Sequence, residues 1–161
     1  MKKTLILAII IMYTFFGCTQ TPMQLSKENL KIENVPKEQA YIYIIRESGL
    51  LGSAGKWAAY VDDILVGQIH NGKKILVKVA PGEHIINPKK KFNLGKANNL
   101  STKVTLEGGK SYYFLHTAKA TSMLSMDFQY TPISYEQGAS MSQDYKLIAT
   151  VDLGKAKEIP S

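Results

Sequence analysis

The sequence predicts a mainly β fold, an antiparallel β-sandwich of about seven strands with a short C-terminal helix. Two observations support this prediction. Short runs rich in β-branched and aromatic residues recur from Ala40 onward, and such runs are typical of strands. Turn signals built from Gly, Pro, Asn and Asp separate the runs at intervals of roughly 8–12 residues, the spacing expected of a sandwich.

The first strand is apolar on both faces until it reaches Arg46, a pattern that suits the centre of a sheet. Asp62 and Asp63 separate two later apolar runs and predict the turn of a hairpin. Asn71-Gly72 is a further tight-turn signal, because both residue types tolerate positive φ. The strands expected in this half of the chain are residues 40–46, 57–61, 64–69 and 74–79.

Residues 88–99 are basic and rich in Asn, and we expect an irregular connection there. Pro132 is expected to end the last clear strand, because proline cannot donate to a ladder. Ser134 followed three residues later by Gln137 has the pattern of a helix start. The remaining expected strands are residues 84–86, 102–107, 112–115 and 126–130, with a short strand at 147–151 after the helix.

Residues 1–17 have the composition of an export signal, with Lys2 and Lys3, a 12-residue apolar run and Gly17 at the end. Cys18 follows and is the only cysteine of the chain. A signal that ends in Gly-Cys resembles that of bacterial lipoproteins, which implies removal of residues 1–17 and acylation of Cys18, for example with palmitate. Two alternatives stay open. One is an ordinary signal cut after Gly17, and the other is an uncleaved anchor, although the run is short of the roughly 20 residues that span a bilayer.

The expected domain organisation has three parts after the signal. Residues 18–39 are mostly polar and predict a tether, residues 40–153 form the β domain, and residues 154–161 form a tail. Four apolar residues of the tether could dock on the domain: Leu25, Leu30, Ile32 and Val35.

The charge of the chain argues against a nucleic-acid partner. Of its 20 basic residues 19 are lysines and Arg46 is the only arginine, whereas proteins that read base sequence rely on arginine. Lys89, Lys90 and Lys91 form a basic run that could face anionic lipid or glycan, with a solvated loop as the alternative. Leu50 and Leu51, in a glycine-rich loop over residues 49–55, could cover the sandwich or contact a partner protein.

Motifs for catalysis are missing from the sequence. No Gly-x-Ser-x-Gly elbow occurs and the single Cys is at the lipid position, so a hydrolase would lack a candidate nucleophile. His70, His84 and His116 lack the spacings of a metal site, and we expect structural roles for them. We therefore predict no enzyme activity, no cofactor and no metal.

Several segments together resemble a known family. They are the strand Ala40 to Arg46 with its glycine loop, Tyr60-Val61-Asp62-Asp63, Val79-Ala80-Pro81-Gly82-Glu83-His84, and Leu106-Glu107-Gly108-Gly109-Lys110-Ser111-Tyr112-Tyr113. From about Ala40 to Leu147 the chain resembles the DUF2846 group of small exported lipoproteins with a sandwich-like β domain. Asp63 stands where that pattern usually has Gly. The Pro-Gly-x-His element is also similar to PEGA-type sandwich modules, where it is structural. The resemblance implies a fold and export, and supplies no catalytic residues.

From these observations we expect a bacterial envelope lipoprotein, held to a membrane by Cys18 and acting as a non-enzymatic structural or protein-interaction module. Another envelope protein or an anionic glycan would be its partner. The alternative is a β-sandwich that binds a small ligand or glycan through its tyrosines. A hydrolase with an unrecognised site is a third hypothesis.

Overall fold

The computed structural model describes residues 34–49, 55–89, 96–122 and 125–154. These residues form ten strands and one helix, and the strands form two packed sheets. The predicted β-sandwich with a short C-terminal helix is confirmed, with ten described strands where about seven were predicted. Several predicted features lie outside the described residues, namely the signal, Cys18, most of the tether, Leu50, Leu51, Lys90, Lys91 and most of the tail.

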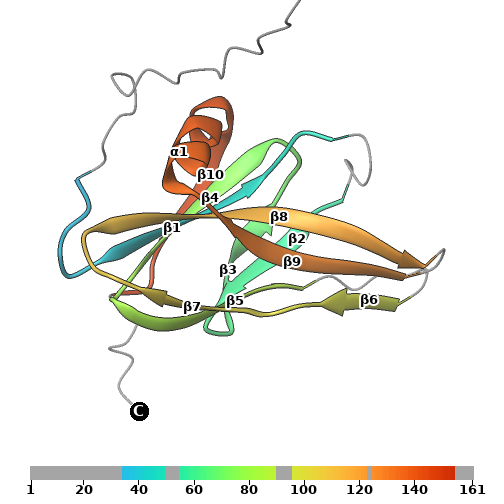
Figure 1. Ribbon diagram of the computed structural model, residues 1–161, viewed down its shortest axis with the longest axis horizontal. Helices are drawn as coiled ribbons and strands as arrows, with labels where there is room; N and C mark the ends of the chain where they lie inside the picture. Colours follow the sequence, from blue (N-terminus) through green and yellow to red (C-terminus); the bar gives the residue numbers. More distant parts are fainter. Residues whose placement is uncertain (1–33, 50–54, 90–95, 123–124, 155–161) are drawn as a thin grey trace, which may run out of the picture.

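The larger sheet has six strands in the order β10-β4-β1-β8-β9-β6. Its centre is β1, in which all seven residues are buried, as the two-sided apolar pattern predicted. The β8–β9 hairpin forms a long arm that carries β6 alongside it (Figure 1). The strands are β1 (Ala40–Arg46), β4 (Lys73–Val79), β6 (Lys96–Asn99), β8 (Lys110–Ser122), β9 (Ser125–Ile133) and β10 (Lys146–Asp152).

The smaller sheet has four strands in the order β3-β2-β5-β7. Its inner face packs on the larger sheet and forms the main core with Trp57, Val61, Ile86 and Leu106. The strands are β2 (Trp57–Val61), β3 (Ile64–Ile69), β5 (Gly82–Lys89) and β7 (Thr102–Leu106).

The larger sheet is mixed, so the expectation of a wholly antiparallel sandwich was wrong. Three of its strand pairs are parallel, namely β1 with β8, β4 with β10 and β6 with β9. A local contact explains the first pair. The Gly109 N–H donates to Gln39 O at 2.8 Å and to Pro36 O at 3.1 Å, which brings the starts of β1 and β8 to the same end of the sheet.

Three local expectations also differ from the structure. Residues 96–99 form β6 instead of a loop, although Asn has low β propensity. Pro132 lies inside β9 opposite Phe114, where β6 no longer pairs with β9, so its missing N–H costs no ladder bond on that side. His116 lies in the middle of β8 instead of ending a strand, because the strand continues to Ser122.

The helix α1 (Tyr135–Asp144) begins where the sequence predicted, with Ser134 Oγ accepting a hydrogen bond from Gln137 N at 3.2 Å. It lies on the outer face of the larger sheet (Figure 1) and covers a second core. In this core the rings of Tyr43 and Tyr113 stack at 5.0 Å between centroids. Gly138 makes the approach possible, because a Cβ there would be 2.1 Å from the Tyr113 ring.

We expect Gly138→Ala to destabilise the protein by about 1–3 kcal/mol through overpacking against Tyr113. Alanine is the better helix former by about 1 kcal/mol, so helix propensity alone would raise the stability. A loss of stability would therefore show that the new Cβ collides with Tyr113. Urea unfolding is the measurement, with the exposed Gln137→Ala as matched control. Equal or greater stability of Gly138→Ala would contradict the proposed packing constraint.

Candidate functional site

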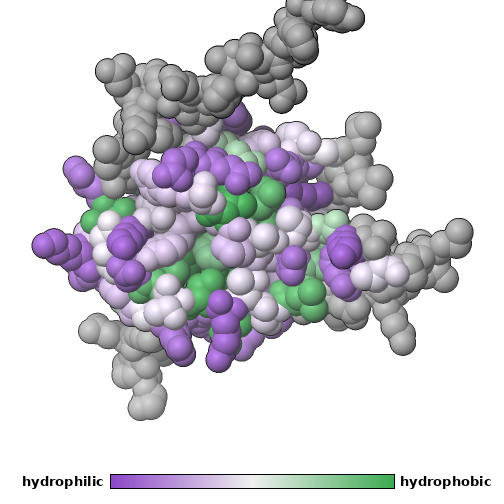
Figure 2. All heavy atoms as spheres, viewed as in Figure 1, coloured by the Kyte–Doolittle hydropathy of each residue, from purple (hydrophilic) through white to green (hydrophobic). Residues whose placement is uncertain are grey.

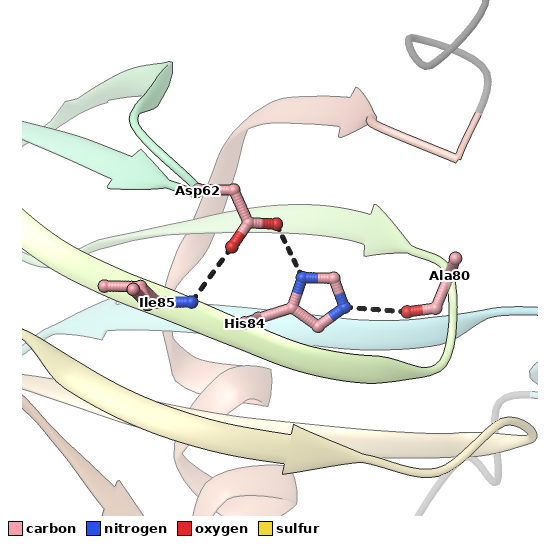
Figure 3. Close-up of polar contacts among 4 residues, drawn as sticks. All are labelled: Asp62, Ala80, His84 and Ile85. Carbon is pink, nitrogen blue, oxygen red and sulfur yellow. Dashed lines mark hydrogen bonds and ion pairs between the residues drawn. The ribbon is translucent and has the colours of Figure 1, made fainter.

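A hydrogen-bonded pair of Asp62 and His84 joins two segments that are far apart in the sequence (Figure 3). Asp62 Oδ2 lies 2.7 Å from His84 Nδ1. The other carboxylate oxygen, Oδ1, accepts a hydrogen bond from Ile85 N at 2.9 Å, and the Asp62 N–H donates to Ile85 O at 2.9 Å. Both oxygens of Asp62 are therefore used to hold the β2–β3 turn against β5.

The turn itself explains why the carboxylate points toward β5. Asp62 has φ 50° and Asp63 has φ 62°, and two successive residues at positive φ are typical of a type I′ hairpin turn. At the Asn71-Gly72 turn only Gly72 has positive φ, at 64°. The predicted turn at the two acids is confirmed. Glycine would adopt the positive φ of Asp63 at less cost.

The second ring nitrogen of His84 is also engaged, since Nε2 lies 2.8 Å from Ala80 O. A carboxylate and a carbonyl can only accept, so both bonds form when both ring nitrogens carry hydrogen. An acid–imidazole pair can orient a general base when the outer nitrogen faces a substrate. Here that nitrogen faces the backbone, and His84 is only 7% exposed.

A shallow pocket of about 320 Å³ adjoins this pair. Its walls come from the turn and from the adjacent strands β5 and β7. The pocket is lined by acidic residues, by Lys103 and by the hydroxyl-bearing Thr105. Its lining residues are Asp62, Glu83, His84, Ile85, Lys103, Val104 and Thr105.

A second polar cluster lies inside the main core around His116. Its ring is 5.4 Å from that of Tyr130 and 5.3 Å from that of Trp57, between centroids. Arg46 is buried nearby and its Nη1 donates to the carbonyls of Gly55 and Ile69. Among the described residues the buried Tyr130 hydroxyl and His116 Nδ1 have no hydrogen-bond partner. Such groups cost about 1–3 kcal/mol each, so packing alone does not explain why polar side chains occupy these positions.

Burial and charge set the protonation of this cluster. Burial, with a smaller effect from the charge of Arg46, lowers the pKa of His116 from 6.5 to about 4. Burial also raises the pKa of Tyr130, against the opposing effect of Arg46. The imidazole is therefore neutral and the phenol protonated at pH 7.

Apart from Tyr60, the described tyrosines lie in or against the two cores, or line one groove. Tyr41, Tyr43, Tyr113 and Tyr130 are buried, as expected for core aromatics. Tyr135 is 39% exposed and lines a groove of about 490 Å³ at the start of β8. The full lining of this groove is Val35, Gly109, Lys110, Ser111, Tyr112, Tyr113, Ile133 and Tyr135.

Of the predicted interaction residues, the structure describes Lys89. Its Nζ lies 3.3 Å from Asp63 Oδ1 and 4.2 Å from the centroid of the Tyr60 ring. Lys89 therefore packs on the outer face of the smaller sheet. Leu65, 52% exposed, pairs with Tyr60 from β3, which adds an apolar residue to that face. Apolar residues form separate patches among polar ones in the view of Figure 2.

In the described part of the chain, no group of three or more His, Cys, Asp or Glu residues is placed to hold a metal ion. The same residues contain no helix of the length and apolarity that a bilayer crossing requires. His70 lies between β3 and β4, beside the Asn71-Gly72 turn, as the sequence predicted.

Two packed sheets, a hydrogen-bonded turn clamp and one covering helix define a small β-sandwich domain. A family model for a protein of unknown function, DUF2846, matches residues 36–127, and the chain belongs to this family. The match ends before α1 and β10. No curated protein matches the chain.

The sequence analysis singled out both Asp62 and His84 but did not predict the hydrogen bond between them. Asp62 was assigned to a turn and His84 to the start of a strand, 22 positions apart. One signal was present, because His84 and Ile86 alternate with the exposed Glu83 and Ile85, which places the imidazole on the inner face. The cluster of Arg46, His116 and Tyr130 had no comparable signal.

We expect Asp62→Ala to destabilise the protein by about 2–3 kcal/mol, because it removes the acceptor of two bonds and leaves His84 buried without its partner. Its neighbour supplies the control. Asp63→Gly loses only an exposed ion pair and relieves positive φ, so we expect a gain of about 0.5 kcal/mol. Urea denaturation of both variants tests this contrast, and equal effects would contradict it.

We expect the stability to fall as the pH drops from 6.5 toward 4, because the unfolded His116 binds a proton in that range and the folded residue does not. This single group accounts for about 3 kcal/mol over the range. The measurement is the pH dependence of the unfolding free energy, compared with that of His116→Phe. The variant should lose this component, and parallel curves for the two proteins would show that His116 does not cause it.

Proposed function

We propose that this protein is a bacterial envelope lipoprotein, anchored through acylated Cys18, whose β-sandwich acts as a non-enzymatic structural or protein-interaction module. Support for the anchor comes from the sequence. Residues 1–17 have the features of an export signal, and Cys18 follows Gly17 directly. A polar stretch then leads to the described domain at Asn34. Two or more acyl chains suffice for stable attachment to a membrane.

The observation that carries the non-enzymatic part of the proposal is the use of the Asp62–His84 pair. Every nitrogen of the imidazole and both oxygens of the carboxylate are engaged with one another or with backbone groups. A general base needs a nitrogen that can reach the proton it abstracts. The pair instead holds a turn, which is a structural role.

The outer face of the smaller sheet is the surface that best suits a protein partner. Leu65 from β3 and Ile85 from β5 are 52% and 38% exposed. Tyr60, half buried, lies beside them in β2 with Lys89 over its ring. Aromatic and apolar residues bordered by charge are typical of interface centres. We propose that another envelope protein binds here.

The groove beside α1 favours the second candidate function, the binding of a small ligand or glycan. Tyr112, Tyr113 and Tyr135 line it, together with Lys110 and Ser111. Pockets that combine aromatic walls with a few polar groups are typical of small-molecule sites. Lys110 is already ion-paired to Glu107 at 2.6 Å, so a neutral ligand suits the groove better than an anion.

One experiment in cells tests both parts of the leading proposal. The chain carries a photo-crosslinking amino acid at Leu65, or at exposed Gln129 as the control position, and the cells grow with a palmitate analogue. We expect label on the parent chain and none on Cys18→Ser. We also expect a discrete crosslinked protein from Leu65 that is missing from Gln129.

Label on Cys18→Ser would contradict the anchor. Crosslinks that are equal from Leu65 and Gln129, or missing from both, would contradict the interaction surface. A crosslink to a saccharide that depends on Tyr135 would favour the second candidate, the binding of a glycan in the groove.

A further inference from the structure

The strand β10 forms one end of the larger sheet and leaves one of its own edges open. It pairs with β4 on one side, and among the described residues no strand pairs with its other side. The bond from Leu153 N to Lys78 O shows which backbone groups face β4. Because successive N–H groups along a strand point in opposite directions, those of Thr150 and Asp152 point away from β4 and face the open edge.

Two large apolar side chains lie near the start of the same strand. Leu147 and Ile148 are both exposed. Ile148 is the extra residue of a bulge, so it has no partner residue in β4. An open edge with exposed apolar side chains is a template for pairing with a further strand.

The charges at the two ends of β10 indicate which strand fits this edge. The strand begins with Lys146 and ends with Asp152. Among the described residues, neither of these two forms an ion pair. If two copies of β10 pair antiparallel, the lysine end of each strand lies beside the aspartate end of the other. A parallel pairing of the two copies would instead place like charges opposite each other, which is destabilising.

We propose that β10 is a dimerisation edge, at which a second copy of this chain pairs antiparallel about a two-fold axis near Ala149. The larger sheets of the two copies then form one continuous sheet. Lys146 of each copy pairs with Asp152 of the other, and Leu147 of each lies opposite Val151 of the other. Both copies use the same surface, so the assembly closes at two chains and does not extend into a fibre. The dimer does not depend on the anchor or on the partner protein proposed above.

Sedimentation equilibrium of residues 18–161 with Cys18→Ser tests this proposal, because that chain can form neither the acyl anchor nor a disulfide between copies. We expect a reversible equilibrium between monomer and dimer. Lys146→Asp alone and Asp152→Lys alone should each weaken the dimer by at least about tenfold, because each sets like charges opposite each other. The double variant should restore the dimer, since its reversed charges attract again. Lys103→Asp, at an exposed lysine of β7, is the matched control and should leave the equilibrium unchanged.

A backbone variant tests the strand pairing itself. Thr150→Pro removes an N–H that faces the open edge, and proline is tolerated at such positions of an edge strand. We expect this variant to be monomeric and to keep the circular dichroism spectrum of the parent chain, because the bonds to β4 are retained.

Four outcomes would overturn the proposal. The parent chain stays monomeric up to millimolar concentration, or the dimer survives both single charge reversals. The double variant dimerises no more tightly than the single ones, or Lys103→Asp weakens the dimer as much as they do. A folded Thr150→Pro that dimerises like the parent chain would show that the contact is not made through the backbone of β10.

Discussion

The imidazole of His84, in β5, holds both the β2–β3 turn and the β4–β5 connection, at the point where the chain passes from the larger sheet to the smaller one. The chain leaves the larger sheet at the end of β4, turns at Ala80 and Pro81, and enters the smaller sheet as β5. His84 bonds back to Ala80 and across to Asp62. With Cys18 as the only cysteine, a disulfide within one chain is impossible. The hydrogen bonds of the buried His84 ring hold this part of the chain instead.

The central strand β1 is buried between the two cores. All of β1 is buried because the smaller sheet covers one of its faces and α1 covers the other. Any change in how the sheets pack would expose Ile42 and Ile44, which are fully buried. Arg46 ends this strand inside the core and bonds to the carbonyls of Gly55 and Ile69. Arg46, at the end of β1, is thus bonded to the segment that precedes β2 and to the last residue of β3.

Local sequence patterns predicted most strands and the helix, because these elements depend on neighbouring residues. Alternation in β4, the acidic turn and the Ser134 cap all follow from short segments. Features that depend on distant residues were not predicted. The parallel pairing of β1 with β8 follows from the Gly109 bonds, and β6 forms on β9 despite its two asparagines. For the candidate site, the sequence indicated the turn at Asp62 but not its contact with His84.

The turn at Asp62 serves the architecture of the sandwich, because its carboxylate bonds only to His84 and to the backbone of Ile85 among the described residues. Asp62 and His84 are expected to act as one unit, since each is the other's side-chain partner. A double-mutant cycle of Asp62→Ala and His84→Ala, measured by urea unfolding, tests this most directly. We predict a coupling free energy of about 1–3 kcal/mol between the two side chains. Additive effects of the two substitutions, with a coupling near zero, would contradict it.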